Sequence, residues 1–165
     1  MSDSVLLSAN ELKTKLSTFQ DVFLNVNIEA KILKKTLEKS LENDFPAKHR
    51  FIRKCLIAMS KCEEKSIIAG FFTATGKYIA MERMLSVNLD EMDLNSLKIL
   101  LFELLERYKR YKADRLILIH HRLVDEATLS AEDRWLFKHL KMHLWQQTDY
   151  FVNANNNCLF LDLEV

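Results

Sequence analysis

Glycine and proline are almost absent from this chain, which has two glycines and one proline among its 165 residues. These residues form the tight turns of hairpins, sandwiches and barrels, so their scarcity favours long helices. The length is that of one domain with a single core. We therefore predict an all-α fold, a single bundle of five or six helices, in which residues 1–157 form one all-helical domain.

The clearest repeat in the sequence is a heptad-like spacing of apolar residues near the N-terminus. Steps of four and three residues continue for more than three heptads, which predicts one long first helix or two collinear helices. Such a helix would present an apolar stripe to a neighbouring helix or to a partner chain. The apolar positions are Leu12, Leu16, Phe19, Phe23, Val26, Ala30, Leu33 and Leu37.

Turn and capping residues predict further helices in the first half of the chain. Pro46 suits the first position of a helix, and the apolar face that follows extends to Cys62. Another helix is expected to end near Val87, and a stripe of small residues within it would let a second helix approach closely. That stripe consists of Ala69, Thr73, Gly76 and Ala80.

The second half of the chain contains two more helix signatures. Asp93 or Asn95 can cap a helix that extends to Tyr111 with apolar residues in heptad spacing. Ser130 and Asp133 resemble a capping box, with Asp in the place of Glu, and this box would open a last helix.

Two segments have sequences that are compatible with strands. Residues 116–119 are apolar on all sides and fit either a buried helical turn or a short strand, and we expect helix because no turn residue precedes them. The last helix is expected to continue through Tyr150. Residues 158–165 then form a short irregular or strand-like tail, which either folds back onto the bundle or adds to the edge of a partner's sheet. Its candidate partner-binding residues alternate along the chain and are Leu159, Leu161, Leu163 and Val165.

Composition and charge restrict where the protein acts and what it binds. No run of apolar residues approaches the roughly 18 that a membrane span needs, and the N-terminus does not resemble a secretion signal. The three cysteines are odd in number and widely spaced, which does not indicate a disulfide framework. We expect an intracellular protein, cytoplasmic in the first instance and nuclear as the alternative, without a membrane partner. The net charge of +1 argues against general binding to polyanions.

The sequence predicts neither a cofactor nor a metal site. His139 and His143 are one helical turn apart, but no third ligand accompanies them at a suitable spacing. A structural or solvent-exposed role is therefore the preferred interpretation of this pair. The chain also lacks a glycine-rich phosphate loop and a nucleophile elbow, which removes the usual support for the common enzyme classes.

The strongest local charge lies in residues 107–122, where basic residues alternate with tyrosines and the net charge is +5. A basic face of this kind can hold an RNA backbone, here through Lys109, Arg110 and Lys112. The alternative is that these cations complement the dipole at the C-terminal end of a helix.

The segment Arg115-Leu-Ile-Leu-Ile-His120 resembles the arginine, four residues, histidine motif of the HEPN domains. The similarity covers residues 66–153, and the family consists of all-helical bundles that include metal-independent ribonucleases. The resemblance implies a homodimer in which His120 transfers a proton at the ribose 2′-hydroxyl while Arg115 steadies the phosphate. Leu116 departs from the polar residue that usually follows the arginine in this family.

Two functions are compatible with these observations. The preferred prediction is a non-enzymatic helical protein–protein interaction module, such as an adaptor, a chaperone-like protein or a regulatory subunit. It agrees with the missing catalytic signatures and requires a protein partner. The alternative is a HEPN-like ribonuclease or RNA-binding protein that acts as a homodimer through Arg115 and His120.

Overall fold

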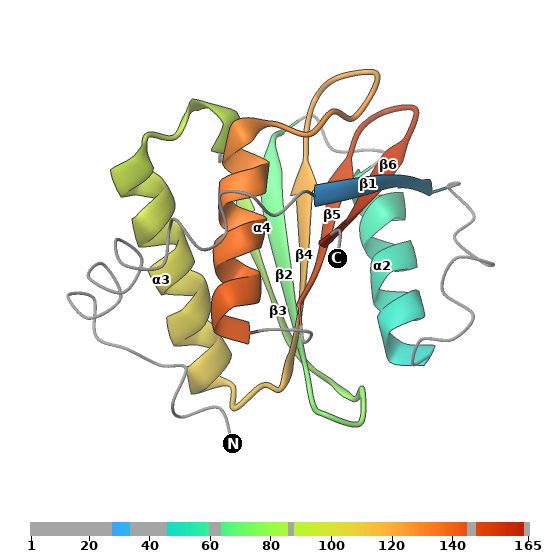
Figure 1. Cartoon of the computed structure of the whole chain (residues 1–165). Helices are drawn as coiled ribbons and strands as arrows, with labels where there is room; N and C mark the ends of the chain where they lie inside the picture. Colours follow the sequence, from blue (N-terminus) through green and yellow to red (C-terminus); the bar gives the residue numbers. More distant parts are fainter. Residues whose placement is uncertain (1–27, 34–45, 60–63, 86–87, 145–147, 164–165) are drawn as a thin grey trace.

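The computed structural model describes residues 28–33, 46–59, 64–85, 88–144 and 148–163 (Figure 1). Strands and helices alternate along these ranges. In chain order they are β1 (Ile28–Leu33), α2 (Pro46–Met59), β2 (Ser66–Phe72), β3 (Tyr78–Leu85), the 3-10 helix η3 (Leu89–Glu91), α3 (Leu94–Arg110), β4 (Arg115–His121), α4 (Ala131–Leu144), β5 (Thr148–Asn153) and β6 (Cys158–Leu163).

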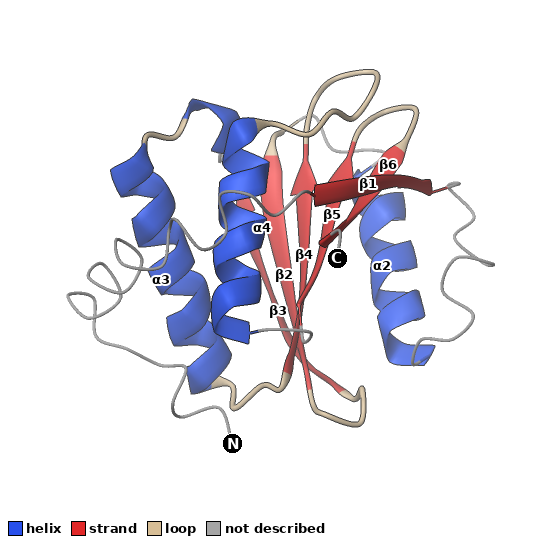
Figure 2. Ribbon diagram, viewed as in Figure 1, coloured by secondary structure: helices blue, strands red, loops and turns tan. Residues whose placement is uncertain are grey.

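The prediction of an all-α helical bundle is wrong, because a sheet forms the centre of the molecule. The described strands form one mixed sheet in the order β1-β6-β5-β4-β2-β3. Helices α3 and α4 lie together on one face of this sheet, and α2 lies on the opposite face (Figures 1 and 2). The chain therefore folds as a three-layer α/β domain. None of the described helices has the length and apolar character needed to cross a bilayer.

Two hairpins and the longer connections that contain α2, α3 and α4 produce this strand order. β2 and β3 are antiparallel neighbours, as are β5 and β6, and β2 also pairs antiparallel with β4. β4 and β5 are parallel, and a parallel pair needs a long connection, which here contains α4. β6 lies between β5 and β1, so the segment predicted to be a separate tail is an inner strand of the sheet.

The larger part of the core lies between the sheet and the layer formed by α3 and α4. Apolar residues on one side of each helix meet alternate residues of β2, β4 and β5. Each large side chain that is fully buried in this way contributes about 1.5–3 kcal/mol to stability. Buried residues of this part include Leu101, Leu104, Leu118, Phe137 and Tyr150.

A second part of the core lies between the sheet and α2. Ile68 of β2 and Ile117 and Ile119 of β4 point to this face. Because β4 is buried on both sides, its sequence contains a continuous run of apolar residues. Gly70 of β2 lets α2 approach closely, because a Cβ atom there would lie 2.5 Å from the ring of Phe51.

The starts of the described helices α2, α3 and α4 agree with the sequence prediction. Pro46 opens α2, and Asp93 caps α3 by accepting a hydrogen bond from the backbone N–H of Ser96 at 2.8 Å. Ser130 and Asp133 form the predicted capping box of α4, in which each backbone N–H donates to the other side chain. Local capping chemistry therefore identified the beginning of each helix.

The helix predicted to end near Val87 is wrong, because this segment forms the β2–β3 hairpin. The isoleucines and phenylalanines of β2 favour a strand that is buried on both faces. A single glycine is enough for the turn, since Gly76 adopts a φ of 88° that glycine reaches without strain. The backbone N–H of Thr73 donates to the carbonyl of Lys77 and closes the hairpin.

Three other helix predictions are also wrong. Residues 28–33 of the long N-terminal heptad form β1, and the remainder of that heptad lies outside the described residues. Residues 116–119 lie in β4. The last helix ends at Leu144, and Tyr150 belongs to β5. In these segments pairing within the sheet outweighs the local periodicity.

Candidate functional site

A group of polar side chains is buried where α4 begins, next to the end of β4. Asp133 lies in the first turn of α4 and is fully buried. Its Oδ1 atom accepts hydrogen bonds from Nδ1 of His120 at 2.8 Å and from the hydroxyl of Tyr150 at 2.6 Å. Its Oδ2 atom accepts a hydrogen bond from the hydroxyl of Ser130 at 2.8 Å. We call these four residues the Asp133 cluster.

The carboxyl group of Asp133 is ionised although it is buried. Burial raises its pKa, but the hydrogen bond and charge of His120 and the hydroxyl donors outweigh this effect, so the pKa is lowered. An ionised carboxylate can only accept, and Nδ1 of His120 therefore carries the proton of their hydrogen bond. Burial and the charge of Asp133 raise the pKa of Tyr150 well above its usual value, which keeps the phenol protonated as a donor.

An ion pair lies beside the Asp133 cluster. Arg122 follows β4, and its Nε atom lies 2.8 Å from Oδ2 of Asp90 in η3. The same guanidinium donates from Nη1 to the carbonyl and to the hydroxyl of Thr128, each at 2.8 Å. These contacts hold the positive charge of Arg122 close to a carboxylate that borders the cluster.

Asp90, His120 and Asp133 together offer atoms that could hold a metal ion. One such atom from each residue lies within 4.8 Å of the other two, and an imidazole with two carboxylates suits zinc and related divalent ions. Oδ1 of Asp90 is buried and has no hydrogen-bond partner among the described residues. A metal ion would, however, have to displace the proton between His120 and Asp133, and the cation of Arg122 already compensates Asp90.

An open groove with a volume of about 570 Å³ lies on the opposite face of the sheet, between α2 and β3. Its floor is apolar, and two large side chains of β3 stand at its wall, Tyr78 with 55% and Met81 with 45% of its surface exposed. We call it the α2–β3 groove. It is lined by Arg50, Phe51, Lys54, Cys55, Ala58, Ile68, Tyr78, Met81 and Arg83.

A β-bulge determines which side chains of β3 enter the groove. Met81 pairs with Gly70 and Tyr78 pairs with Phe72, with the irregularity lying between Phe71 and Phe72. Tyr78 and Met81 therefore point to the same face although they are three residues apart. Among the described strands β3 pairs with β2 alone, so the outer backbone groups of β3 border the groove.

The charge of the groove has one sign. Arg50 and Lys54 on α2 and Arg83 on β3 line it, and none of the lining residues is acidic. Burial raises the pKa of the Cys55 thiol to about 12, although the charge of Arg83 acts in the opposite direction. This cysteine is therefore protonated near neutral pH and is a packing residue, since reactivity requires the thiolate.

The structure does not bring Arg115 and His120 together. They are the first and sixth residues of β4, so their side chains leave opposite faces of the sheet roughly 16 Å apart along the strand. Arg115 donates from Nε to the carbonyl of Ala74 at the tip of the β2–β3 hairpin. His120 is buried and hydrogen-bonded to Asp133.

The predicted RNA-binding residues surround the C-terminal end of α3. Lys109 and Arg110 lie in its last turn, where cations complement the helix dipole, and Lys112 follows with a φ of 52°. All three side chains are exposed. The neighbouring Tyr108 is fully buried, so this tyrosine belongs to the core and not to a basic surface.

The structure buries those residues of the predicted partner-binding tail whose side chains are described. Leu159 and Leu161 are buried with 6% and 1% of their surface exposed. Leu163 pairs through its backbone with Ile28, and Val165 lies outside the described residues. The period of two therefore marks an inner strand and not an exposed docking segment.

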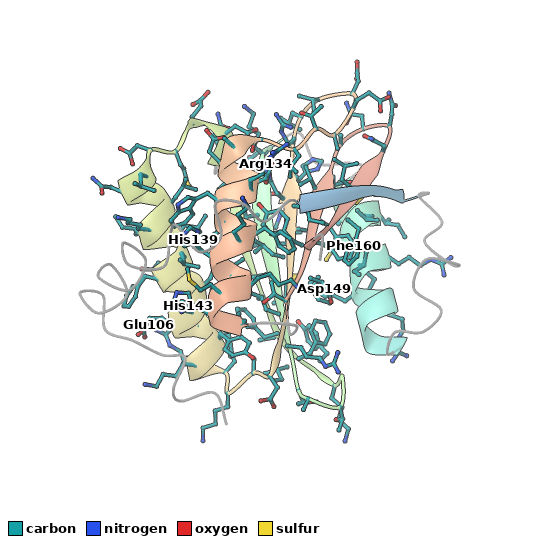
Figure 3. The ribbon with its side chains drawn as sticks, viewed as in Figure 1. Glu106, Arg134, His139, His143, Asp149 and Phe160 are labelled. Atoms are coloured by element: carbon teal, nitrogen blue, oxygen red, sulfur yellow. The ribbon has the colours of Figure 1, made fainter. Side chains whose placement is uncertain are left out.

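The histidine pair of α4 faces the neighbouring helix. His139 and His143 are buried and lie on the side of α4 that faces α3 (Figure 3). The ring of His139 stacks on Trp135 with 4.0 Å between ring centroids, and its Nδ1 lies 2.8 Å from the carbonyl of Trp135. His139 is therefore a packing residue between the two helices.

Sequence reasoning did not recognise Asp90, His120 and Asp133 as one set, and it did not predict the groove. Ser130 and Asp133 were recognised only as a helix cap, and His120 was assigned to a motif with Arg115. The available signal was a buried strand that ends in a histidine and is followed by a carboxylate in the first turn of the next helix. No comparable signal marks the groove, because its residues come from two distant segments.

No protein-family model matches this chain, and no curated protein matches it. The fold and the sites thus define the class: a three-layer α/β domain with a buried His–Asp cluster on one face of its sheet and a basic, apolar groove on the other.

Proposed function

We propose that this chain is a non-enzymatic protein-interaction domain that holds a protein partner in the α2–β3 groove. The observation that carries this proposal is the exposure of Tyr78 and Met81 in a concave site with an apolar floor. Concave sites that combine apolar side chains with a few polar groups are typical binding sites. The domain would act as an adaptor or regulatory subunit.

The arrangement of the Asp133 cluster agrees with a structural role. The carboxylate of Asp133 receives donors from β4, from β5 and from the start of α4, so it joins three elements at one point. Fully satisfied buried networks of this kind specify one packing arrangement. This interpretation gives the buried polar residues a function that needs no substrate.

We also propose an intracellular, cytoplasmic location. Cys55 is a buried thiol that forms no disulfide with another described cysteine, and unpaired cysteines are common in reducing compartments.

The proposal is tested by affinity capture with matched surface substitutions. Met81→Glu places a charge in the groove, and Ile99→Glu makes the same change on α3, where Ile99 has 57% of its surface exposed. We expect the full-length wild type and Ile99→Glu to retain the same protein partner from a cell lysate, and Met81→Glu to lose it. Circular dichroism should show that both variants are folded. Retention of the partner by Met81→Glu would refute the assignment to the groove.

A second candidate function is binding of a divalent metal ion by Asp90, His120 and Asp133. It is favoured by the convergence of these three residues and by the buried, unpartnered Oδ1 of Asp90. Equilibrium dialysis against zinc, followed by elemental analysis, would then give one ion per chain. Asp90→Asn would lower this value, whereas the exposed Asp125→Asn would not. Equal zinc content in both variants would exclude this candidate.

A further inference from the structure

We infer that the partner is an extended segment of another protein that pairs with the outer edge of β3. Its groove-facing side chains, which occur at every second residue, include both apolar and acidic ones. This inference rests on the proposed function and specifies the chemistry of the partner. Its three supports are the outer edge of β3, with which no described strand pairs, the apolar floor of the groove and the sign of the charge along it.

The backbone of β3 provides the first support. β3 spans Tyr78–Leu85, and in the described part of the chain its only pairing partner is β2. An edge strand presents alternating N–H and C=O groups, and an extended peptide can satisfy them by adding one more strand. A helical partner would leave these backbone groups without matching donors and acceptors.

The side chains of the groove provide the second support. In an added strand every second residue would point toward α2, as Met81 and Arg83 do in β3. Apolar residues at some of these positions would cover Met81, Tyr78 and the floor around Ile68. The periodicity of two in the partner follows from this geometry.

The charge of the groove provides the third support. Arg50 and Lys54 stand on successive turns of α2, and Arg83 lies across from them on β3. Acidic side chains at the other groove-facing positions of the partner would lie close to these cations, which favours both the encounter and the correct register. A basic segment would meet like charges and would be rejected.

A second copy of this chain fits the groove less well. Pairing of β3 with its own copy in a continuous antiparallel sheet would place the two grooves on the same face, with the cations of one next to those of the other. A nucleic acid also fits less well, because Met81 and Ile68 offer it an apolar floor where a phosphate backbone needs donors and cations.

The experiment measures fluorescence anisotropy of labelled ten-residue peptides with the full-length protein. The test peptide, called the valine–glutamate peptide, carries valine and glutamate in turn at every second position, with serine between them. In the control peptides lysine replaces its glutamates or serine replaces its valines. The protein variants are Arg50→Glu/Lys54→Glu in the groove and Lys109→Glu/Arg110→Glu on α3, which change the net charge equally. We expect the valine–glutamate peptide to bind best, the groove variant to weaken it by about tenfold or more, and the α3 variant to leave it unchanged.

Isotope-labelled protein gives the position of the peptide. Amide signals of residues 78–85 should shift on addition of the valine–glutamate peptide, because these groups would form the new hydrogen bonds. Binding that leaves these signals in place would overturn the strand-addition arrangement.

Other outcomes would overturn the inference while leaving the proposed function intact or removing it as well. If no peptide binds but capture of a partner still depends on Met81, the partner has a different chemistry and the interaction domain stands. If a ten-residue uridine oligonucleotide binds in a groove-dependent way, the partner is a nucleic acid and not a peptide segment. A dimer that Met81→Glu dissociates would replace it by a second copy. If neither peptide binding nor capture depends on Met81, both proposals fail.

Discussion

Several hydrogen bonds converge on the side chain of Asp133. Its carboxylate accepts from an imidazole, a phenol and a hydroxyl, and it lies at the positive end of the α4 dipole. These donors lower its pKa in the folded chain in spite of burial. In the unfolded chain the same group titrates near its ordinary value of about 3.9. The folded protein is therefore stabilised by the ionised form.

Asp133→Asn should lower the free energy of unfolding by about 3 kcal/mol at pH 7, because an amide cannot accept from all of these donors. Since the folded pKa is depressed, the unfolded chain binds more protons as pH falls below about 5, and the stability supplied by Asp133 is progressively lost. The difference in the free energy of unfolding between wild type and variant, measured by urea denaturation, should thus be largest at pH 7 and smaller near pH 3. The exposed Asp125→Asn should change stability by less than about 0.5 kcal/mol. A difference that does not depend on pH would contradict this account.

At the scale of elements, the position of α2 depends on one glycine in β2. The ring of Phe51 lies directly over Gly70, where a Cβ atom would be 2.5–2.9 Å from three of its atoms. The same ring makes an edge contact with Phe72 at 5.4 Å between centroids. Because Phe51 also forms part of the groove floor, this contact determines the distance between α2 and β3.

Gly70→Ala should destabilise the protein by about 1–3 kcal/mol, because the added methyl group overfills this contact. The penalty should largely disappear in a Phe51→Ala background, where the space above Gly70 is vacant. A double-mutant cycle measured by urea denaturation gives this coupling directly. Additive effects of the two substitutions would show that Phe51 does not limit residue 70.

The contact between α3 and α4 contains a titratable residue. Burial lowers the pKa of His139, and the charges of Lys138 and Lys98 act in the same direction, while its hydrogen bond to Trp135 opposes them. The pKa of His139 in the folded protein lies below its value of about 6.5 in the unfolded chain. The contribution of neutral His139 to the free energy of unfolding is therefore complete above pH 6.5, and it is lost as pH falls through the folded pKa.

Between pH 6.5 and 5 the wild type should lose up to about 1.4 kcal/mol per pH unit through His139, the limit for one proton. His139→Phe keeps an aromatic ring on Trp135 and removes the titration. Thermal denaturation of both proteins across this range should give a shallower pH dependence for the variant. Parallel curves would mean that His139 does not control acid stability.

The elements show how far the sequence determines this fold. Caps and a helix-opening proline identified the starts of α2, α3 and α4, because these signals act within one turn of helix. The strands were missed because β2 and β4 are buried on both faces and lack alternation, which makes them resemble buried helix. The scarcity of glycine misled the prediction further, since Gly76 alone supplies the positive φ of the β2–β3 turn.

The candidate sites were less predictable than the elements. Asp90, His120 and Asp133 come from three segments that meet only after β4 and α4 are positioned. The groove combines residues 50–58 with residues 68–83, and the strand assignment of the second segment was necessary to recognise it. Sites of this kind depend on the order of the strands in the sheet, and this order cannot be predicted from local sequence periodicity.

At the scale of the whole molecule, β6 connects the N-terminal strand to the remainder of the sheet. It pairs with β5 on one side and with β1 on the other, and Leu161 is almost fully buried. The C-terminal segment is thus part of the core.

Leu161→Asp should destabilise the domain by more than about 3 kcal/mol, because it buries an unpaired charge in the sheet. Thermal denaturation should show a large fall in Tm or no cooperative transition. Leu123→Asp, at a position that is 40% exposed, should have a small effect. A folded Leu161→Asp variant that merely loses its partner would restore the tail as a docking segment.

The two candidate sites lie on opposite faces of the sheet, with the Asp133 cluster beside α4 and the groove beside α2 (Figure 1). They share no side chain, so they can be altered independently. The central claim concerns the groove alone: a protein segment contacts the surface around Met81.

Site-specific photocrosslinking in cells tests this claim most directly. A photoreactive amino acid is placed at position 81 in the groove or at position 99 on α3, both of which are exposed and apolar in the wild type. The account predicts one discrete protein adduct from position 81 that is absent from position 99. Failure of position 81 to form an adduct, or the same adduct from both positions, would contradict it.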